Sequence, residues 1–453
     1  MIAPLQQPVH SSSAPLRVAM MEGRVRAHGS DPAGAAVAIG LAAFFCLLPY
    51  PAYAVGQATA VQIGNVGAAL ACLPALWVPW RRIFFMYPLL IAPLLISIMA
   101  HVFTGGDQGN LAMKTSIVWC MSLLPLLMIQ LHAPRYGVAI LVGMAAATLV
   151  HAIVGLWQVY AFSQNYFPLV EIYRNPSFLS VQDNADMFAR WMKRPFGIFP
   201  EPSAMSASLG PWVLIWSALV CGVVRLKQPL ARWQQLLFAA AAVGGISLII
   251  LSRSGLTVVL VPVLLLIAGL WLLRARASQG AFLAMIAALA IILPMLLWFA
   301  ANAIGNRIGG GPIGNSSWEE RASSLVLGFS IFTDGGIGTL VFGMGPGLAS
   351  LAVRDASGME AVWSVLLNYL YDTGLVGMLA AGCVALHLLR MWQESRYEPV
   401  FVGVLFVWLV AVLLTTSYDQ LLSLWLILGW LTVWPNVMEP SRATSRAVEG
   451  RLR

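Results

Sequence analysis

Long hydrophobic runs separated by short polar segments dominate the pattern along the chain. The runs are about 20 residues long, the length of an α-helix that crosses a ~30 Å hydrocarbon core. They predict twelve spans, at residues 33–53, 57–79, 83–101, 113–132, 137–160, 203–224, 234–251, 255–273, 281–303, 362–389, 399–416 and 420–435. Segments of alternating polarity, typical of a membrane β-barrel, are missing from this pattern. We therefore expect an all-α, polytopic transmembrane helix bundle of about twelve spans.

Composition supports the same class of protein. Of 453 residues, 59% are hydrophobic and only 10% are charged, whereas a soluble domain has about 25% charged residues. This composition argues against a soluble enzyme, a disordered protein and a fibrous repeat. The five cysteines lie inside apolar runs without CxxC spacing, so the sequence predicts neither a disulfide framework nor a zinc site.

The positions of the basic residues predict the orientation in the membrane. Cytoplasmic loops carry an excess of Lys and Arg. With the N-terminus inside, 17 of the 26 Lys and Arg residues fall in cytoplasmic segments. We therefore expect a cytoplasmic basic tail at 1–32, a transmembrane domain at 33–435 and a second cytoplasmic basic tail at 436–453. This anchoring accounts for the net charge of +8, and no nucleic acid partner is expected.

Two external loops are long, at about 161–202 and 304–361, and each carries eight charged residues. Long loops in compact proteins usually serve a function or are disordered. The second loop contains Ser-Ser-Trp-Glu-Glu, a capping-box spacing, followed by apolar residues at helical intervals: Trp318, Ala322, Leu325, Phe329 and Phe332. It predicts an amphipathic helix over about 317–333, on the membrane surface or on the bundle. Asp183 is a candidate cap for a short helix in the first loop.

Three candidate site residues lie at or near the end of the first loop and in the next external turn. Arg194 and Glu201 belong to the segment R-P-F-G-I-F-P-E-P-S, in which prolines on both sides stiffen the backbone around Glu201. The alternative is a structural Arg–Glu pair or a helix-start signal, because carboxylates are stabilised near helix N-termini. Arg253 lies in the tight turn S-R-S-G. The alternative for Arg253 is a side chain that reaches the lipid headgroups.

The remaining candidates follow in the second loop and the tenth span. Arg321 lies at the edge of the apolar stripe, and arginine suits bidentate phosphate binding; the alternative is an intrahelical pair with a neighbouring glutamate. Asn368, Tyr369 and Asp372 form a polar stripe that faces a cavity or makes interhelical hydrogen bonds. The glycine-dense segment 343–347 lacks the Lys-Ser/Thr of a P-loop, so we interpret it as a close-approach turn. No metal-ligand motif is present, and neither a metal nor another cofactor is expected.

Four motifs, taken in order, resemble those of the O-antigen ligase and polymerase superfamily. They are R-x-x-G-x-F-x-E-P-S at Arg194–Ser203, S-R-S-G at Ser252–Gly255, E-R followed by F-G-M-G-P-G at Glu320–Gly347, and L-x-N-Y-L-x-D-x-G-L-x-G at Leu366–Gly377. The resemblance covers about 40% of the chain. It implies a bacterial inner-membrane glycosyltransferase with a GT-C-like fold. The implied substrate is an undecaprenyl-diphosphate-linked oligosaccharide, used at the periplasmic face.

The resemblance favours a Wzy-type polysaccharide polymerase over a ligase, because ligases typically carry a His-Asn pair where Trp363-Ser364 stands here. Such an enzyme transfers the lipid-linked glycan to a sugar hydroxyl of a lipid-linked repeat unit, without metal and with inversion. We expect Arg194, Arg253 and Arg321 to bind the diphosphate and Glu201 to act as general base. Asn368, Tyr369 and Asp372 would line the acceptor side. The lipid bilayer, a chain-length regulator and a flippase are the expected partners. The alternatives are a ligase that transfers glycan to lipid A core or protein, and a polysaccharide transporter or flippase.

Overall fold

The computed structural model describes ten stretches of the chain. They are 32–48, 62–74, 86–102, 107–168, 193–199, 201–254, 312–358, 362–394, 399–415 and 422–439. The expected spans 255–273 and 281–303 lie outside the described residues, as does the short helix expected after Asp183.

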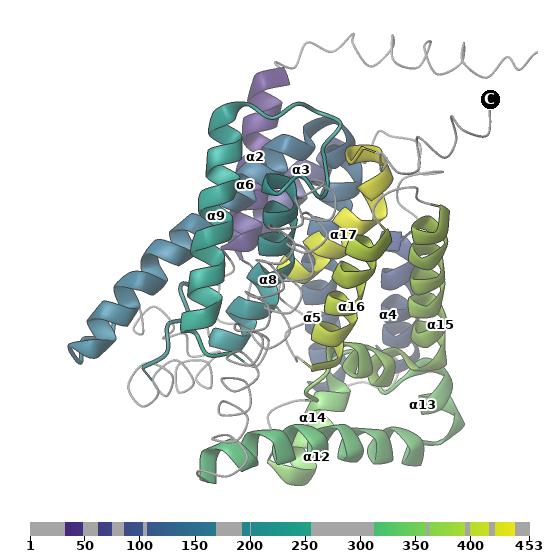
Figure 1. Cartoon of the computed structure of the whole chain (residues 1–453). Coiled ribbons are helices and arrows are strands. Elements are labelled where there is room, and N and C mark those ends of the chain that lie inside the picture. Colours follow the sequence, from purple (N-terminus) through teal and green to yellow (C-terminus); the bar gives the residue numbers. More distant parts are fainter. Residues whose placement is uncertain are drawn as a thin grey trace, which may run out of the picture.

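Regular structure in these stretches is helical (Figure 1), apart from one isolated bridge between Leu226 and Met438. The helices, in chain order, are α2 (Pro32–Leu47), α3 (Ile63–Cys72), α4 (Met86–Val102), α5 (Asp107–Ser122), α6 (Leu124–Ser163), α8 (Pro202–Val220), α9 (Arg232–Leu251), α12 (Pro312–Asp334), α13 (Gly336–Phe342), α14 (Leu348–Ser357), α15 (Val365–Glu394), α16 (Pro399–Thr415) and α17 (Leu422–Val437). The prediction of an all-helical chain is confirmed for the described part.

Four of these helical stretches are long and apolar enough to cross a membrane. They are Gly109–Ser163, Pro202–Val220, Arg232–Leu251 and Val365–Met391. The pair α12–α13 forms a fifth candidate, bent by 119° at its break. The other apolar helices are shorter, and the expected number of twelve spans stays a prediction.

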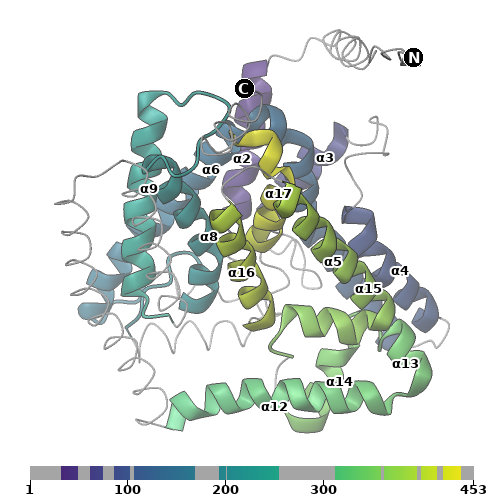
Figure 2. The ribbon, with the colours of Figure 1, turned by 45° about the vertical axis from the view of Figure 1, so that its right-hand side comes forward.

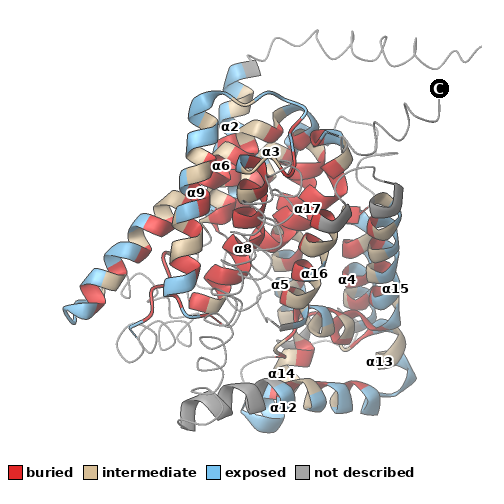
Figure 3. Cartoon of the chain, in the orientation of Figure 1, coloured by how far each residue is buried: buried red, intermediate tan, exposed pale blue. Residues whose placement is uncertain are grey.

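Helix α17 lies at the centre of the bundle, and 14 of its 16 residues are buried. The indole ring of Trp430 packs against that of Trp212 from α8, with ring centroids 6.0 Å apart. Ser423 donates a hydrogen bond to Ser208 at 2.7 Å. The buried hydroxyl of Ser423 is thus satisfied within the bundle, whereas the indole N–H groups of Trp212 and Trp430 are buried without a hydrogen-bond acceptor among the described residues. Figure 3 shows the buried residues concentrated around α17, α8 and α6.

The end of α17 pairs with the segment that precedes α9. The backbone N–H of Lys227 donates to the carbonyl of Val437 at 2.9 Å, and that of Glu439 donates to the carbonyl of Arg225 at 2.8 Å. Gln228 donates to the carbonyl of Arg135, beside a break in α6 at Tyr136. Three segments expected on the cytoplasmic side thus lie at one end of the molecule.

Helix α12 lies at the opposite end, across the bundle (Figures 1 and 2). The helix expected at 317–333 is therefore present, but its buried face differs from the expected stripe. Phe332 is buried and Leu325 half-buried, whereas Phe329 is 59% exposed. The buried face passes through Gly328, because the ring of Tyr371 lies against the position where a side chain would begin. The side chain of Trp318 lies outside the described residues.

Candidate functional site

The segment before α8 is fixed on α6 by one glutamine. Gln158 is fully buried, and its Oε1 accepts hydrogen bonds from the N–H groups of Phe196 at 3.0 Å and Gly197 at 2.8 Å. Its Nε2 donates to the carbonyl of Gly197 at 2.9 Å. Gly197 has a φ of +61°, and a side chain at this position would meet the ring of His151. These contacts hold the backbone of Phe196 and Gly197, between Arg194 and Glu201 in the sequence, in one conformation.

His151 supports the same segment from about two helical turns earlier in α6. Its Nδ1 accepts from the N–H of Ile198 at 3.2 Å, and its Nε2 lies 2.9 Å from the carbonyl of Leu47. This pair of partners fits a neutral ring with the proton on Nε2. The ring stacks on Phe199 with centroids 4.5 Å apart. The sequence analysis missed His151 and Gln158, although two polar residues seven apart in an apolar span share a helix face.

The side chain of Arg194 lies against the backbone of the turn that contains Arg253. The guanidinium of Arg194, whose residue is 9% exposed, donates from Nε to the carbonyl of Ser252 at 2.6 Å and from Nη2 to that of Arg253 at 2.8 Å. These carbonyls follow the last turn of α9, where the helix dipole favours a positive charge. The planar fork of arginine matches two neighbouring acceptors. Arg194 therefore holds the turn that carries Arg253.

The turn presents Arg253 outward in a strained conformation. Arg253 has a φ of +52° and is exposed. Such a conformation is uncommon for a non-glycine residue and is found at functional sites when the surroundings enforce it. The two bonds from Arg194 supply part of this enforcement. An exposed guanidinium fixed at its backbone is suited to contact a phosphate group.

A pair of serines joins this turn to the start of α8. The Oγ atoms of Ser206 and Ser252 lie 3.3 Å apart, and Ser206 also donates to the carbonyl of Pro202 at 2.9 Å. Glu201 precedes Pro202 and occupies the N-cap position of α8. The ends of α8 and α9 therefore bring Arg194, Glu201 and Arg253 into one part of the molecule.

The side chain of Glu201 is buried, with the residue 5% exposed, and it does not cap its own helix. The helix-start alternative for this segment agrees with the structure, because α8 begins at Pro202 directly after Glu201. A carboxylate beside the N-terminus of α8 is stabilised by the helix dipole. Glu201 thus lies at the end of α8 that the contact between Ser206 and Ser252 joins to the turn of Arg253.

The polar residues of α15 lie in a second cluster and bind the protein itself. Asp372 is fully buried, and its Oδ2 accepts from the N–H of Gly347 at 2.9 Å. Tyr369 donates from its hydroxyl to the carbonyl of Leu90 at 2.8 Å. Asn368 accepts from Ser350 at 3.1 Å. These bonds match the interhelical hydrogen-bond interpretation, and no contact described here joins these three residues to Arg194, Glu201 or Arg253.

The glycine-dense segment packs backbone to backbone against a break in α15. Gly343 and Gly374 have φ of +83° and +65°, and a Cβ on Gly374 would lie 2.5 Å from the backbone nitrogen of Gly343. The N–H groups of Met344 and Gly345 donate to the carbonyls of Tyr371 and Asp372. The close-approach interpretation of this segment agrees with these contacts.

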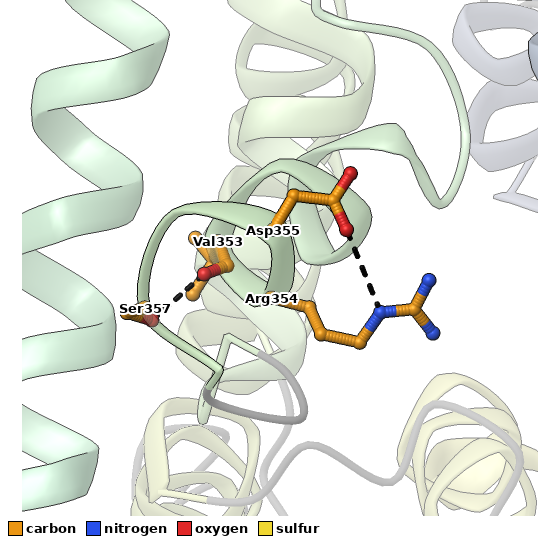
Figure 4. Close-up of polar contacts among 4 residues, drawn as sticks. All are labelled: Val353, Arg354, Asp355 and Ser357. Carbon is orange, nitrogen blue, oxygen red and sulfur yellow. Dashed lines mark hydrogen bonds and ion pairs between the residues drawn. The ribbon is translucent and has the colours of Figure 1, made fainter.

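Two further arginines belong to the second long loop. The backbone of Arg321 lies in α12, and its side chain lies outside the described residues. Arg354, near the end of α14, points outward beside Asp355 with Nε and Oδ1 3.8 Å apart (Figure 4), and both side chains are well exposed. Exposed pairs of this kind contribute little to stability.

Comparison with known proteins gave no match. No protein-family model matches the chain, and no curated protein or solved structure is similar to it. Among the described residues, no group of three His, Cys, Asp or Glu side chains is placed to hold a metal ion.

Proposed function

We propose that the chain is a membrane glycosyltransferase of the polysaccharide-polymerase type. It transfers a glycan from undecaprenyl diphosphate to a sugar hydroxyl of a second lipid-linked repeat unit. The observation that carries the proposal is the turn after α9, where buried Arg194 fixes the backbone of exposed Arg253 next to the start of α8. The motifs that resemble the O-antigen ligase and polymerase superfamily include both arginines.

The proposed reaction needs positive charge at the leaving group. The acceptor hydroxyl attacks the anomeric carbon, the bond from that carbon to the diphosphate breaks, and the diphosphate lipid leaves with a greater negative charge. Preorganised cationic donors stabilise such charge, because they need no reorganisation when it develops. Arg253 is the exposed donor at this position, Arg194 positions it, and Arg321 is the third candidate contact. Direct displacement inverts the configuration at the anomeric carbon.

Glu201 is the proposed general base, which accepts the proton of the attacking hydroxyl. A base of this kind must come within hydrogen-bond reach of the hydroxyl in the productive complex. Its N-cap position holds the carboxylate at the end of α8 that also carries Ser206 and its contact to the Arg253 turn. In this proposal Asn368 and Asp372 support the acceptor side through residues 347–350, which they bind, and Tyr369 supports it through its contact with α4. Asn368 is the least buried of the three.

Reconstitution tests the proposal. The full chain is placed in liposomes with lipid-linked repeat units, and the products are separated by size and identified by mass spectrometry. We expect long lipid-linked polymer from the wild type and at least ~100-fold less from Arg253→Ala, in line with the loss of a donor to developing charge. Arg232→Ala is the matched control, because Arg232 is an exposed arginine at the other end of the same helix. Wild-type polymer from Arg253→Ala would overturn the site.

The proposed location is a bacterial inner membrane, with both chain termini in the cytoplasm and the site facing the periplasm. Two observations support this proposal: segments 225–227 and 437–439 pair at one end of the molecule, and Arg194 binds the 252–253 turn. A chain-length regulator and a flippase are the proposed protein partners. If transfer ends on lipid A core or on a protein instead of a repeat unit, the product analysis identifies a ligase.

One observation favours a transporter as the second candidate. Helix α15 is broken at Gly374, beside the buried Asp372, and broken helices with buried charge are typical of transporters. Asp372 binds the backbone of Gly347, which supports a structural role instead. Movement of labelled lipid-linked oligosaccharide across proteoliposomes without elongation would identify a transporter.

A further inference from the structure

An apolar groove lies between α15, α16 and α17, at the end of the molecule where α17 ends. Its volume is about 200 Å³, and the residues that line it are apolar, among them Leu388, Val407, Trp434 and Pro435. Val407 is 64% exposed, so the groove opens to the outside of the bundle. The helices that form it are apolar along this length. A hydrocarbon chain is the partner that such a lining accepts, because a polar occupant would lose its hydrogen bonds with water.

A positively charged segment lies where the groove meets the end of α17. Pro435 lines the groove, and the ammonium of Lys227 donates to its carbonyl at 2.9 Å. Lys227 and Arg225 are exposed, and the backbone of 225–227 pairs with residues 437–439. The exposed Glu439 is the acidic residue of this strand pair. The pair therefore keeps a net positive charge beside an apolar groove.

We infer that this groove binds an anionic diacyl phospholipid of the adjacent leaflet. One acyl chain occupies the groove, and the phosphate lies near Lys227. Basic residues at the membrane surface attract anionic lipids with about 1 kcal/mol each, which corresponds to an about fivefold preference over zwitterionic lipids. The inference is independent of the proposed chemistry, because it uses the opposite ends of α15 and α17 from those near the proposed site.

Native mass spectrometry of the full chain tests the inference. The protein is equilibrated with equal amounts of phosphatidylglycerol and phosphatidylcholine in detergent, and the lipids that stay bound are counted. We expect one retained phospholipid with an about fivefold excess of phosphatidylglycerol. Lys227→Gln should retain one lipid but lose the excess. Equal retention of both lipids by the wild type, or a protein dimer without lipid, would overturn the inference.

Two variants fill the groove without touching the basic segment. Gly403→Leu adds a side chain inside the groove, and Val407→Trp adds bulk at its exposed rim. Both should lose the retained lipid. Gly382→Leu is the matched control, because Gly382 is exposed on α15 with open space beyond it, and it should bind lipid as the wild type does. If both filled variants remain folded in size-exclusion chromatography and still retain lipid, the groove is not the site.

Discussion

Replacing Arg253 by glycine should increase stability and abolish activity. A left-handed conformation costs a non-glycine residue about 1–2 kcal/mol, and Arg253 adopts a φ of +52°. Glycine avoids this cost but loses about 0.5–1 kcal/mol more conformational entropy on folding. Arg194 donates its hydrogen bonds to the backbone carbonyls of Ser252 and Arg253, so a change of the side chain at position 253 leaves these bonds in place. The net expectation for Arg253→Gly is a gain of about 0.5–1 kcal/mol in the free energy of unfolding.

Arg253→Ala separates the two effects, because alanine removes the guanidinium and keeps the strain. Its free energy of unfolding should stay within about 0.5 kcal/mol of the wild type, as for other exposed positions. Both variants should lose polymer formation. Unfolding is followed in detergent by tryptophan fluorescence during a denaturant titration, and activity by the reconstituted assay. A glycine variant less stable than the alanine variant would refute the strain argument, and an active glycine variant would refute the role of the guanidinium.

Three further substitutions test the framework of the site, each measured by the same denaturant titration. Arg194→Lys should lose about 1.5–3 kcal/mol of stability, because an ammonium cannot reproduce the fork that binds two carbonyls. Gln158→Leu should lose about 2–4 kcal/mol, because three buried hydrogen bonds to the segment before α8 disappear; an unchanged stability would mean that this segment is held by other contacts. Gly374→Ala should lose more than about 1 kcal/mol, since its φ is positive and Gly343 leaves no space, whereas the control Gly382→Ala should be neutral or slightly stabilising.

The helices were the most predictable part of the fold. An apolar run of about 20 residues has few alternatives to a helix in a membrane, because its backbone groups must be satisfied internally. The expected span 203–224 is α8, which begins one residue earlier at Pro202, and the expected span 234–251 is α9. Arg194 and Arg253 were both expected in external segments, and the structure places the Arg194 side chain against the Arg253 turn; the membrane face on which they lie stays a prediction.

The contacts of the site residues were not predictable. Arg194 binds main-chain carbonyls, which leave no signal in the sequence because every residue has one. The sequence shows that Asn368 and Asp372 share one face of a helix. Their spacing alone does not tell whether this face lines a cavity or forms hydrogen bonds with a neighbouring segment. For α12 the apolar periodicity predicted the helix but not the face that is buried. Gly328 adds nothing to the hydrophobic pattern, yet its lack of a side chain lets the ring of Tyr371 pack against the helix backbone.

The central position of α17 has a consequence for biogenesis. It is the last of the described helices to leave the ribosome, yet nearly all of its residues are buried. Until it is inserted, the faces of α8 that later receive Ser423 and Trp430 have only lipid or an insertion factor as neighbours. Assembly of the bundle centre therefore waits until α17 has been synthesised. Translation arrest before residue 422 should leave an inserted but protease-sensitive chain.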